Sequence, residues 1–330
     1  MTGDGNDPAV IAARYTEVQS WFLPESLGGI LGLGSSEVER ISLAWLGKAG
    51  KRWRPFLAAC MFDAFAAEGG SGPDPAAVRQ IVIALECVHK ASLVYDDVQD
   101  GDDQRYGEPT VHVLHGVPVA LTVSLHLLGL GYRLIADCAA PPDRRAAMLT
   151  LATDGHCQLC LGQGAELLWM RSPRPLTPGE VLDIFRLKTA PSFDVVFRLP
   201  ALAHGAGPEV HAVLRAYAEA IGTAYQVADD LDDFHGGGDV DDVMRGRPSI
   251  VMALVHQAAG GADRDLIAET WCARRGDPAR VKRLIADLGS EQAARDILAG
   301  LKRDALGSLD RLANRRLAGL LARVADMVFA

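Results

Sequence analysis

Apolar residues recur along most of this chain at intervals of three and four positions, which is the spacing that places them on one face of an α-helix. Helix starts are also marked by local chemistry. Asp74-Pro75 and Asp277-Pro278 each put a capping side chain before a proline at the first helical position, and Thr177 with Glu180 forms a capping box. The expected helices cover residues 8–22, 36–47, 53–68, 75–98, 117–138, 144–170, 178–199, 209–234, 248–259, 264–274, 278–287 and 290–327, the last broken near 307.

No segment alternates apolar and polar residues in the way that a sheet requires, and no internal repeat is present. The stretches rich in glycine and proline are short, as connectors between packed helices are. The sequence therefore predicts an all-α fold, with residues 1–330 forming a single helical domain.

Charge and composition narrow the function. The chain has 33 basic and 42 acidic residues, and the resulting net charge of −9 argues against nucleic acid as a partner. The first residues lack a signal peptide pattern, and the longest apolar run, 117–131, is shorter than the ~18–20 residues that cross a bilayer. We expect a cytoplasmic protein without a membrane span, whose six cysteines are mostly buried thiols.

Much of the acidity lies in two clusters with the same internal spacing, more than a hundred residues apart. Positions i and i+4 of a helix share a face, so each cluster would present carboxylates in one direction. Oxygen ligands in this arrangement suit Mg²⁺, which is commonly shared between carboxylates and substrate phosphates. The alternative is a pair of solvated helix ends, but apolar helices lead into both clusters. The clusters are Asp96-Asp97-x-x-Asp100 and Asp229-Asp230-x-x-Asp233.

Basic residues near these clusters are candidates for binding a diphosphate. Lys51, Arg52 and Arg54 lie between a glycine and a proline, and Arg groups can hold phosphate oxygens with two hydrogen bonds. An exposed turn paired with surface acids is the other interpretation of this segment. Arg105 follows the first cluster, and Arg247 follows the second.

Three further positions are consistent with the same site. Pro191, after Lys188-Thr189-Ala190, predicts a helix kink that frees a backbone carbonyl beside a threonine hydroxyl. Gln226 lies one turn before Asp230. His89 lies two turns before Asp96, and it is either a core histidine or part of the site.

Together these residues resemble the trans-isoprenyl diphosphate synthases, the polyprenyl synthetase family. Five segments carry the resemblance, in the order that the family has them, and they cover most of residues 45–250. They are GKRWRP (50–55), VHKASLVYDDVQDGDDQRYGEPTVH (88–112), GQGAEL (162–167), KTA (188–190) and GTAYQVADDLDD (222–233).

The resemblance implies a helical bundle around a central cavity, a homodimer, and three Mg²⁺ ions in each site. The activity implied is condensation of isopentenyl diphosphate with an allylic diphosphate to a longer all-trans chain. The implied metal ligands are Asp96, Asp100 and Asp229, supported by Asp97, Asp230 and Asp233. The implied allylic diphosphate ligands are Arg105, Lys188, Thr189 and Gln226. The implied isopentenyl diphosphate ligands are Lys51, Arg54 and His89, and Arg247 stands where the family often has a lysine.

The chain departs from the family pattern at Tyr106, because paired arginines usually follow the first cluster. The second arginine helps to bind isopentenyl diphosphate in the family, so this contact is lost or supplied elsewhere. Two alternatives follow: a terpene synthase that ionises its substrate without coupling, or a regulatory subunit of a heteromeric synthase. Lys51, Arg54 and His89 weigh against the first, and the complete aspartate clusters against the second.

Product length is expected to depend on the helix wall below the first cluster. Ser92 and Ala91 precede Asp96 by four and five residues, roughly 6–7.5 Å along the helix axis. Short-product members of the family carry bulky aromatic residues there. These two small residues therefore favour geranylgeranyl diphosphate or a longer product over farnesyl diphosphate.

Overall fold

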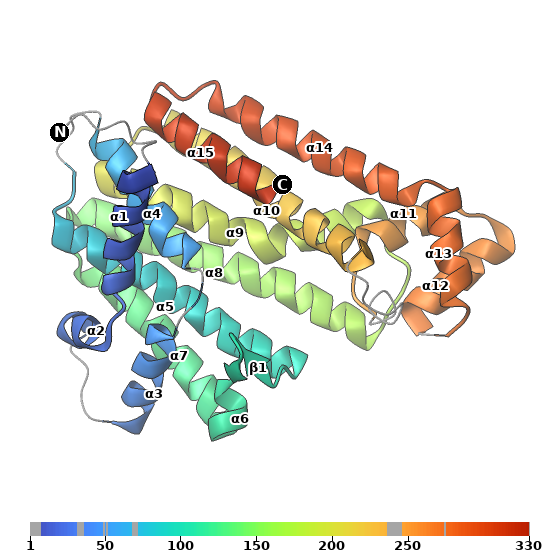
Figure 1. Cartoon of the computed structure of the whole chain (residues 1–330), viewed down its shortest axis with the longest axis horizontal. Helices are drawn as coiled ribbons and strands as arrows, with labels where there is room; N and C mark the ends of the chain where they lie inside the picture. Colours follow the sequence, from blue (N-terminus) through green and yellow to red (C-terminus); the bar gives the residue numbers. More distant parts are fainter. Residues whose placement is uncertain are drawn as a thin grey trace. The chain divides into compact units, whose positions relative to one another are not determined.

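The computed structural model describes residues 8–31, 36–48, 50, 52–67, 72–235, 246–273 and 275–329, and these residues are almost entirely helical (Figure 1). The chain divides into two compact units. Unit 1 comprises residues 1–152 and 196–206, and unit 2 comprises 153–195 and 207–330. The single domain expected above stays a prediction.

Unit 1 contains the N-terminal helices, one short hairpin, and parts of the two long helices that run into unit 2. Its longest complete helix, α5, is covered by α3, α4 and α7. The elements are α1 (Pro8–Ser20), α2 (Pro24–Leu31), α3 (Glu37–Gly47), α4 (Trp53–Ala66), α5 (Pro75–Asp100), β1 (Gln104–Arg105), β2 (Glu108–Pro109), α6 (Val111–His115), α7 (Val117–Asp137), the start of α8 (Pro142–Arg171) and the end of α9 (Pro178–His204).

The boundaries of α5 come from its local sequence. The Asp74 side chain accepts a hydrogen bond from the Ala77 amide at 2.7 Å, Pro75 opens the helix, and Gly101 ends it with φ +70°. Toward α7, a Cβ added at Gly131 would lie 2.8 Å from Val88 and 3.1 Å from the Ala84 carbonyl. The glycine therefore allows α7 to approach α5 closely.

The helix α7 is long and apolar enough to cross a membrane by length and composition, whereas the sequence pattern had predicted a run too short to do so. A core helix passes the same test, and α7 packs against α3, α5 and α6 within unit 1. Its buried residues include Val123, Leu127 and Leu134.

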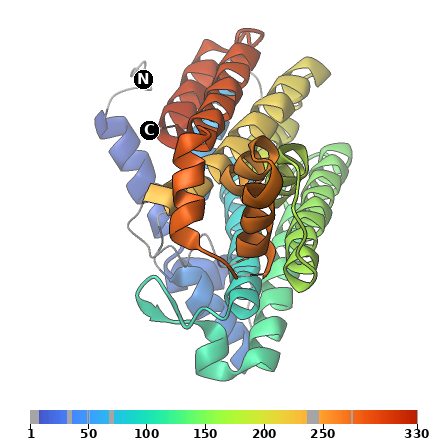
Figure 2. The ribbon, with the colours of Figure 1, turned by 90° about the vertical axis from the view of Figure 1, so that its right-hand side faces the viewer.

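Unit 2 is built around α10, with α14 and α15 packed on it; Figures 1 and 2 show α14 and α15 side by side. Tyr217 on α10 is fully buried, and its hydroxyl donates to the Leu321 carbonyl on α15. A second apolar cluster surrounds Trp169 and Trp271, whose ring centroids are 5.6 Å apart. The elements that unit 2 adds are α10 (Pro208–His235), α11 (Ile250–Ala258), α12 (Gly261–Ala273), α13 (Pro278–Asp287), α14 (Ser290–Leu309) and α15 (Arg315–Val328).

The all-α prediction is confirmed, with local differences. The short helices α2 and α6 and the two-stranded hairpin were not predicted, and the final break falls at residues 310–314 rather than near 307. Helix α9 continues through Pro191. All six cysteines are within the described residues and form no disulfide. The expectation that most are buried is wrong, because only Cys87 and Cys138 are buried, while Cys60 and Cys272 are half-buried and Cys157 and Cys160 are exposed.

Candidate active site

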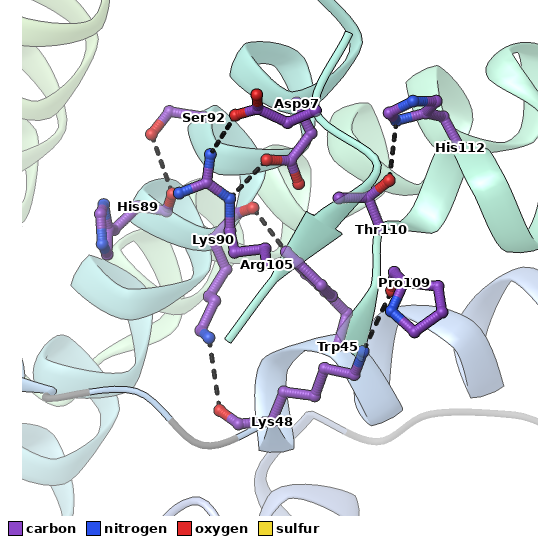
Figure 3. Close-up of polar contacts among 11 residues, drawn as sticks. Trp45, Lys48, His89, Lys90, Ser92, Asp97, Arg105, Pro109, Thr110 and His112 are labelled. Atoms are coloured by element: carbon purple, nitrogen blue, oxygen red, sulfur yellow. Dashed lines mark hydrogen bonds and ion pairs between the residues drawn. The ribbon is translucent and has the colours of Figure 1, made fainter. Parts of the chain in front are cut away.

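The first aspartate cluster lies at the C-terminal end of α5, where its three carboxylates have different environments. Asp97 is buried and accepts a hydrogen bond from Arg105 Nε, while Asp96 is half-buried and Asp100 exposed (Figure 3). A second guanidinium nitrogen of Arg105 lies 3.5 Å from Asp102 Oδ2. The Asp97 pKa is raised by burial, although Arg105 opposes the shift. Arg105 therefore joins this cluster by neutralising its buried member.

Arg105 is held in place by the hairpin that follows α5. The turn residues Tyr106 and Gly107 have φ values of +58° and +76°, and positive φ at both central residues defines the type I′ turn of a two-residue hairpin. Lys48, after α3, forms an ion pair with Glu108 at 2.8 Å and donates to the Pro109 carbonyl at 3.4 Å. These contacts fix the second strand, and with it the position of Arg105.

The structure brings together two of the basic residues predicted to hold isopentenyl diphosphate. Arg54 Nη1 lies 3.2 Å from His89 Nε2, and the Arg54 guanidinium lies 4.3 Å from the centroid of the Trp53 ring. Burial lowers the pKa of His89 well below its usual value, and the charges of Arg54, Lys90 and Arg105 lower it further. His89 is thus a neutral acceptor for Arg54, surrounded by cations.

The two other basic residues of the GKRWRP segment are Arg52 and Lys51. Arg52 is buried and donates to the Gly47 carbonyl at 2.6 Å and to the Lys48 carbonyl at 3.1 Å, so this part is not an exposed turn. It satisfies carbonyls that end α3, which is a structural role. Lys51 lies outside the described residues.

In unit 2, the second aspartate cluster occupies the C-terminal part of α10. Asp229 and Asp233 are exposed, but the protein around the Asp229 carboxylate still removes part of its hydration, which raises its pKa. The like charges of Asp233 and Asp232 raise this pKa further. The positive charges of Lys188 and Arg247 act on Asp229 in the opposite sense. The structure thus places Lys188 and Arg247 within the electrostatic reach of Asp229.

Asp230 has a different role, because its carboxylate caps the N-terminus of α11. One oxygen, Oδ2, accepts hydrogen bonds from Ser249 Oγ at 3.0 Å, the Ile250 amide at 2.8 Å and the Val251 amide at 3.3 Å. Burial raises the pKa of Asp230 to about 7 in spite of these bonds. The carboxylate therefore connects the end of α10 to the start of α11, where an anion is favoured.

The Lys188-Thr189-Ala190 segment of α9 lies between two glycines on neighbouring helices. A Cβ added at Gly162 on α8 would lie 2.5 Å from the Lys188 amide nitrogen, and one at Gly222 on α10 would lie 2.3 Å from the Ala190 Cα. Real Cβ atoms do not approach backbone so closely, so both positions require glycine. The glycines fix the backbone of this segment.

The side chains of this segment are also held. Lys188 Nζ donates to Glu166 Oε2, and Glu166 is buried. Thr189 is buried, and Gln226 on α10 is half-buried. Whether Lys188, Thr189 and Gln226 bind an allylic diphosphate stays a prediction, as does the carbonyl freed by Pro191.

The residues fit Mg²⁺ as ligands shared with a substrate. Among the described residues, no group of three acidic, histidine or cysteine side chains is arranged to hold a metal alone. Two features nevertheless favour a cation: Asp97 Oδ2 is buried without a hydrogen-bond partner, and like charges raise the pKa of Asp229. At each cluster separately, a divalent ion bound partly by carboxylates and partly by diphosphate oxygens would relieve the unfavourable feature named for that cluster.

Sequence reasoning missed two charged groups, one in each unit. In unit 2, Glu166 pairs with Lys188, and its place in the GQGAEL segment that carries the family resemblance was the available signal. Lys90 lies beside His89 on α5 and is fully buried, a state that a lysine rarely adopts. The position of Lys90 within an apolar helical run was the signal in the sequence for this burial.

Comparison with known proteins agrees with these segments. The family model described as Polyprenyl synthetase matches residues 35–288. The chain is 27% identical over 261 residues, 77% of each protein, to the short chain isoprenyl diphosphate synthase of Methanothermobacter thermautotrophicus. It is 34% identical over 239 residues, 70% of this chain and 76% of the relative, to the geranylgeranyl diphosphate synthase of Pseudescherichia vulneris.

A solved structure shows the same fold. The geranylgeranyl pyrophosphate synthase of Corynebacterium glutamicum, complexed with isoprenyl diphosphate and magnesium, superposes with a TM-score of 0.77 over 98% of each chain at 21% identity. The matched family segment includes both aspartate clusters and every basic residue discussed above. The chain therefore belongs to the polyprenyl synthetase family of trans-isoprenyl diphosphate synthases, which are prenyltransferase enzymes.

Proposed function

We propose that this enzyme condenses isopentenyl diphosphate with an allylic diphosphate, in the presence of Mg²⁺, to give a longer all-trans polyprenyl diphosphate. The observation that carries the proposal is the Arg54–His89 pair on the same unit as the Asp96 cluster. Coupling needs a second diphosphate site besides the metal site, and this basic pair supplies it. An enzyme that only ionised one substrate would not need it.

In the proposed mechanism, Lys188, Thr189, Gln226 and Arg105 orient the allylic diphosphate. Bound Mg²⁺, held by Asp96, Asp100 and Asp229 with three ions in each site, would supply positive charge to the leaving diphosphate. The allylic C–O bond breaks, and the double bond of isopentenyl diphosphate attacks the allylic cation to form the new C–C bond. The released diphosphate takes the proton that the product loses.

The residues of this chain have defined parts in that sequence. Glu166 holds the Lys188 ammonium, and Arg54 with neutral His89 holds isopentenyl diphosphate. Asp97 and Asp230 fix Arg105 and the end of α10, and Asp233 supports the second metal cluster. Arg247, whose charge acts on Asp229, adds a cation near the leaving group.

The test is incubation of the purified enzyme with Mg²⁺, isopentenyl diphosphate and, separately, dimethylallyl, geranyl or farnesyl diphosphate. Mass spectrometry before and after phosphatase treatment should show elongated diphosphates. Hydrocarbons or alcohols formed without isopentenyl diphosphate would instead assign an ionising terpene synthase. No turnover of any primer, with a partner subunit restoring it, would assign a regulatory subunit.

For product length, the structure supports Ser92 more than Ala91. Ala91 is buried toward α7, where its carbonyl accepts a hydrogen bond from Ser124 Oγ at 2.7 Å. Ser92 is half-buried and shares a helix face with Asp96. We therefore propose Ser92 as the small residue that lets the tail pass, with geranylgeranyl diphosphate or a longer chain as product. Ser92→Phe should shift the longest product to farnesyl diphosphate, whereas Ser92→Ala should leave it unchanged.

We also propose that the enzyme is a homodimer through the exposed face of α8. Leu161 and Leu168 are 60% and 68% exposed, and they share one face with Cys157 and Gly164. Leu161→Arg should convert a dimer to a monomer in light scattering. Met327→Arg, at an exposed position of α15, should leave the dimer intact. A monomeric wild-type enzyme would contradict the proposal.

A cytoplasmic location completes the proposal. Helix α7 packs against α3 and α5 in unit 1, which covers part of its apolar surface. Fractionation of expressing cells should recover the tagged enzyme with the soluble proteins, and recovery with the membranes would contradict this location.

A further inference from the structure

Tyr106 adopts a backbone conformation that its side chain does not favour. It is the first residue of the two-residue hairpin turn, with φ +58°, a position usually filled by glycine, asparagine or aspartate. A bulky residue in this region costs on the order of 1–3 kcal/mol and persists only where its surroundings hold it. The structure shows what holds it.

Two side chains beneath the turn contact the Tyr106 ring. Lys90 Nζ lies 4.4 Å from its centroid, and the Trp45 ring centroid lies 6.5 Å away. Lys90 Nζ is also 5.4 Å from the Trp45 centroid, and Trp45 Nε1 donates to the Lys90 carbonyl at 3.0 Å. The ammonium therefore binds two aromatic faces at once, and one of them is Tyr106.

The ring end of Tyr106 lies against the GKRWRP segment. A Cβ added at Gly50 would lie 3.2 Å from the Tyr106 hydroxyl oxygen and 3.2 Å from Cζ. The phenol is thus beside the start of the segment that also supplies Arg54, and its side chain remains 46% exposed. The hydroxyl at this place is also within the electrostatic reach of Arg54, whose charge acts on the Tyr106 phenol.

Positive charge exceeds negative charge behind the ring. Lys90 is fully buried, and its ammonium donates to the Lys48 carbonyl at 3.3 Å (Figure 3). Burial lowers its pKa to about 8, and the cations Arg52, Lys48 and Arg105 act in the same direction. The opposing carboxylate is Glu86, whose pKa burial raises to about 7. A cluster of cations opposed by a half-neutral acid favours an anion in front of it.

We propose that Tyr106 is a further substrate-binding residue, whose hydroxyl contacts the diphosphate of isopentenyl diphosphate beside Gly50, while Lys90 fixes its ring from behind. Lys90 is a positioning residue that also supplies charge through the ring. Tyr106 supplies a hydrogen-bonding hydroxyl and Lys90 supplies positive charge, whereas a single arginine at this position would supply both. The inference rests on the proposed function, since it assigns a second ligand set to isopentenyl diphosphate.

The test compares Tyr106→Phe and Lys90→Met with the wild-type enzyme. Tyr106→Phe removes the hydroxyl but keeps the ring on the ammonium, so the KM for isopentenyl diphosphate should rise about 3- to 10-fold, the factor for one hydrogen bond. The KM for the allylic diphosphate and the midpoint of thermal unfolding should not change. Lys90→Met should raise the same KM. In the double variant, the increase in KM should be smaller than the product of the two single increases.

Controls separate this role from a structural one. Lys302→Met removes another lysine that contacts an aromatic ring, 5.5 Å from the Phe329 centroid on α15, and should change neither KM. If Lys90→Met does not fold, Lys90→Arg should fold and keep the KM for isopentenyl diphosphate near the wild-type value. Equal KM values for this substrate in Tyr106→Phe and wild type would overturn the inference.

A binding measurement keeps the two proposals distinguishable. Calorimetric titration with isopentenyl diphosphate should give weaker binding to Tyr106→Phe than to wild type, whether or not the enzyme turns over. Elongation by wild type with equal affinities of the two proteins would overturn the inference alone. Absence of elongation, with weaker binding to the variant, would overturn the proposed coupling and keep the contact.

Discussion

The two aspartate clusters have the same spacing but are held by different means. In unit 1, the buried member Asp97 is neutralised by Arg105, and the surrounding hairpin is fixed by the side chains of Lys48 and Lys90. In unit 2, the corresponding Asp230 accepts from backbone amides at the start of α11. One cluster depends on side-chain charge, and the other on backbone contacts.

The same contrast extends to the basic residues of each unit. Arg54 and His89 are positioned by contacts between side chains, whereas the backbone around Lys188 is fixed by Gly162 and Gly222. Substitutions that remove charge should therefore affect unit 1 more, and substitutions that add volume should affect unit 2 more. Four experiments test this difference.

The largest effect is expected where the two clusters should behave alike. Asp96→Asn and Asp229→Asn each remove a proposed metal-ligating charge, and each should lower kcat/KM at least about 100-fold, because the leaving diphosphate loses its counter-charge. Steady-state kinetics at several Mg²⁺ concentrations provides the measurement. A variant with wild-type turnover at any of these concentrations would remove that aspartate from the metal site.

The next effect is confined to unit 2. Gly222→Ala should lower the free energy of unfolding by about 3 kcal/mol, because the new Cβ overlaps the Ala190 backbone. The control is Gly307→Ala on α14, where a Cβ meets no atom within 4 Å and helix propensity favours alanine by about 1 kcal/mol. Urea unfolding measures both, and similar values would show that the close approach is not needed.

A smaller effect separates Asp97 from Asp230. Asp97→Asn leaves the partly exposed Arg105 with only the more distant Asp102 as an anion and should lower the free energy of unfolding by about 1–2 kcal/mol. Asp230→Asn keeps an oxygen for the α11 amides and removes a charge that burial already disfavours, so a loss of no more than about 0.5 kcal/mol is expected. The reverse order in urea unfolding would contradict the contrast between charge and backbone contacts.

The smallest effect is a dependence on pH. The pKa of Lys90 is lowered to about 8, so its neutral fraction increases as pH rises through this value. The KM for isopentenyl diphosphate should therefore rise about 3-fold between pH 7 and 9, and Lys90→Met should abolish this rise. The KM for the allylic substrate should not follow it, because Lys90 is not among the residues proposed to bind that substrate.

Much of this arrangement could be predicted because it is local in the sequence. Asp74 and Thr177 announce helix starts, and the spacing of the aspartates places them on a helix face regardless of tertiary contacts. The helices α2 and α6 have 8 and 5 residues, too few to show a helical period. The hairpin was missed because Tyr106-Gly107 is not one of the dipeptides that mark a type I′ turn.

The partners of the site residues could not be read from the sequence. Asp97 and Asp230 occupy the same position in motifs of the same aspartate spacing, yet one contacts a guanidinium and the other a helix terminus. The choice depends on which segment lies nearby after folding. Glu166 and Lys90 were present in the recognised segments, but their roles follow from burial, which appears only when α8 and α5 have packed.

The packing of α7 has a consequence for the synthesis of the chain. Its two main partners, α3 and α5, precede it in sequence, so they have left the ribosome before α7 is complete. The one helix among the described residues that is long and apolar enough to cross a membrane thus emerges next to surfaces already available to cover it, instead of waiting for a later segment. The order of the helices limits the time during which this helix is exposed to chaperones, to the membrane insertion machinery or to other nascent chains.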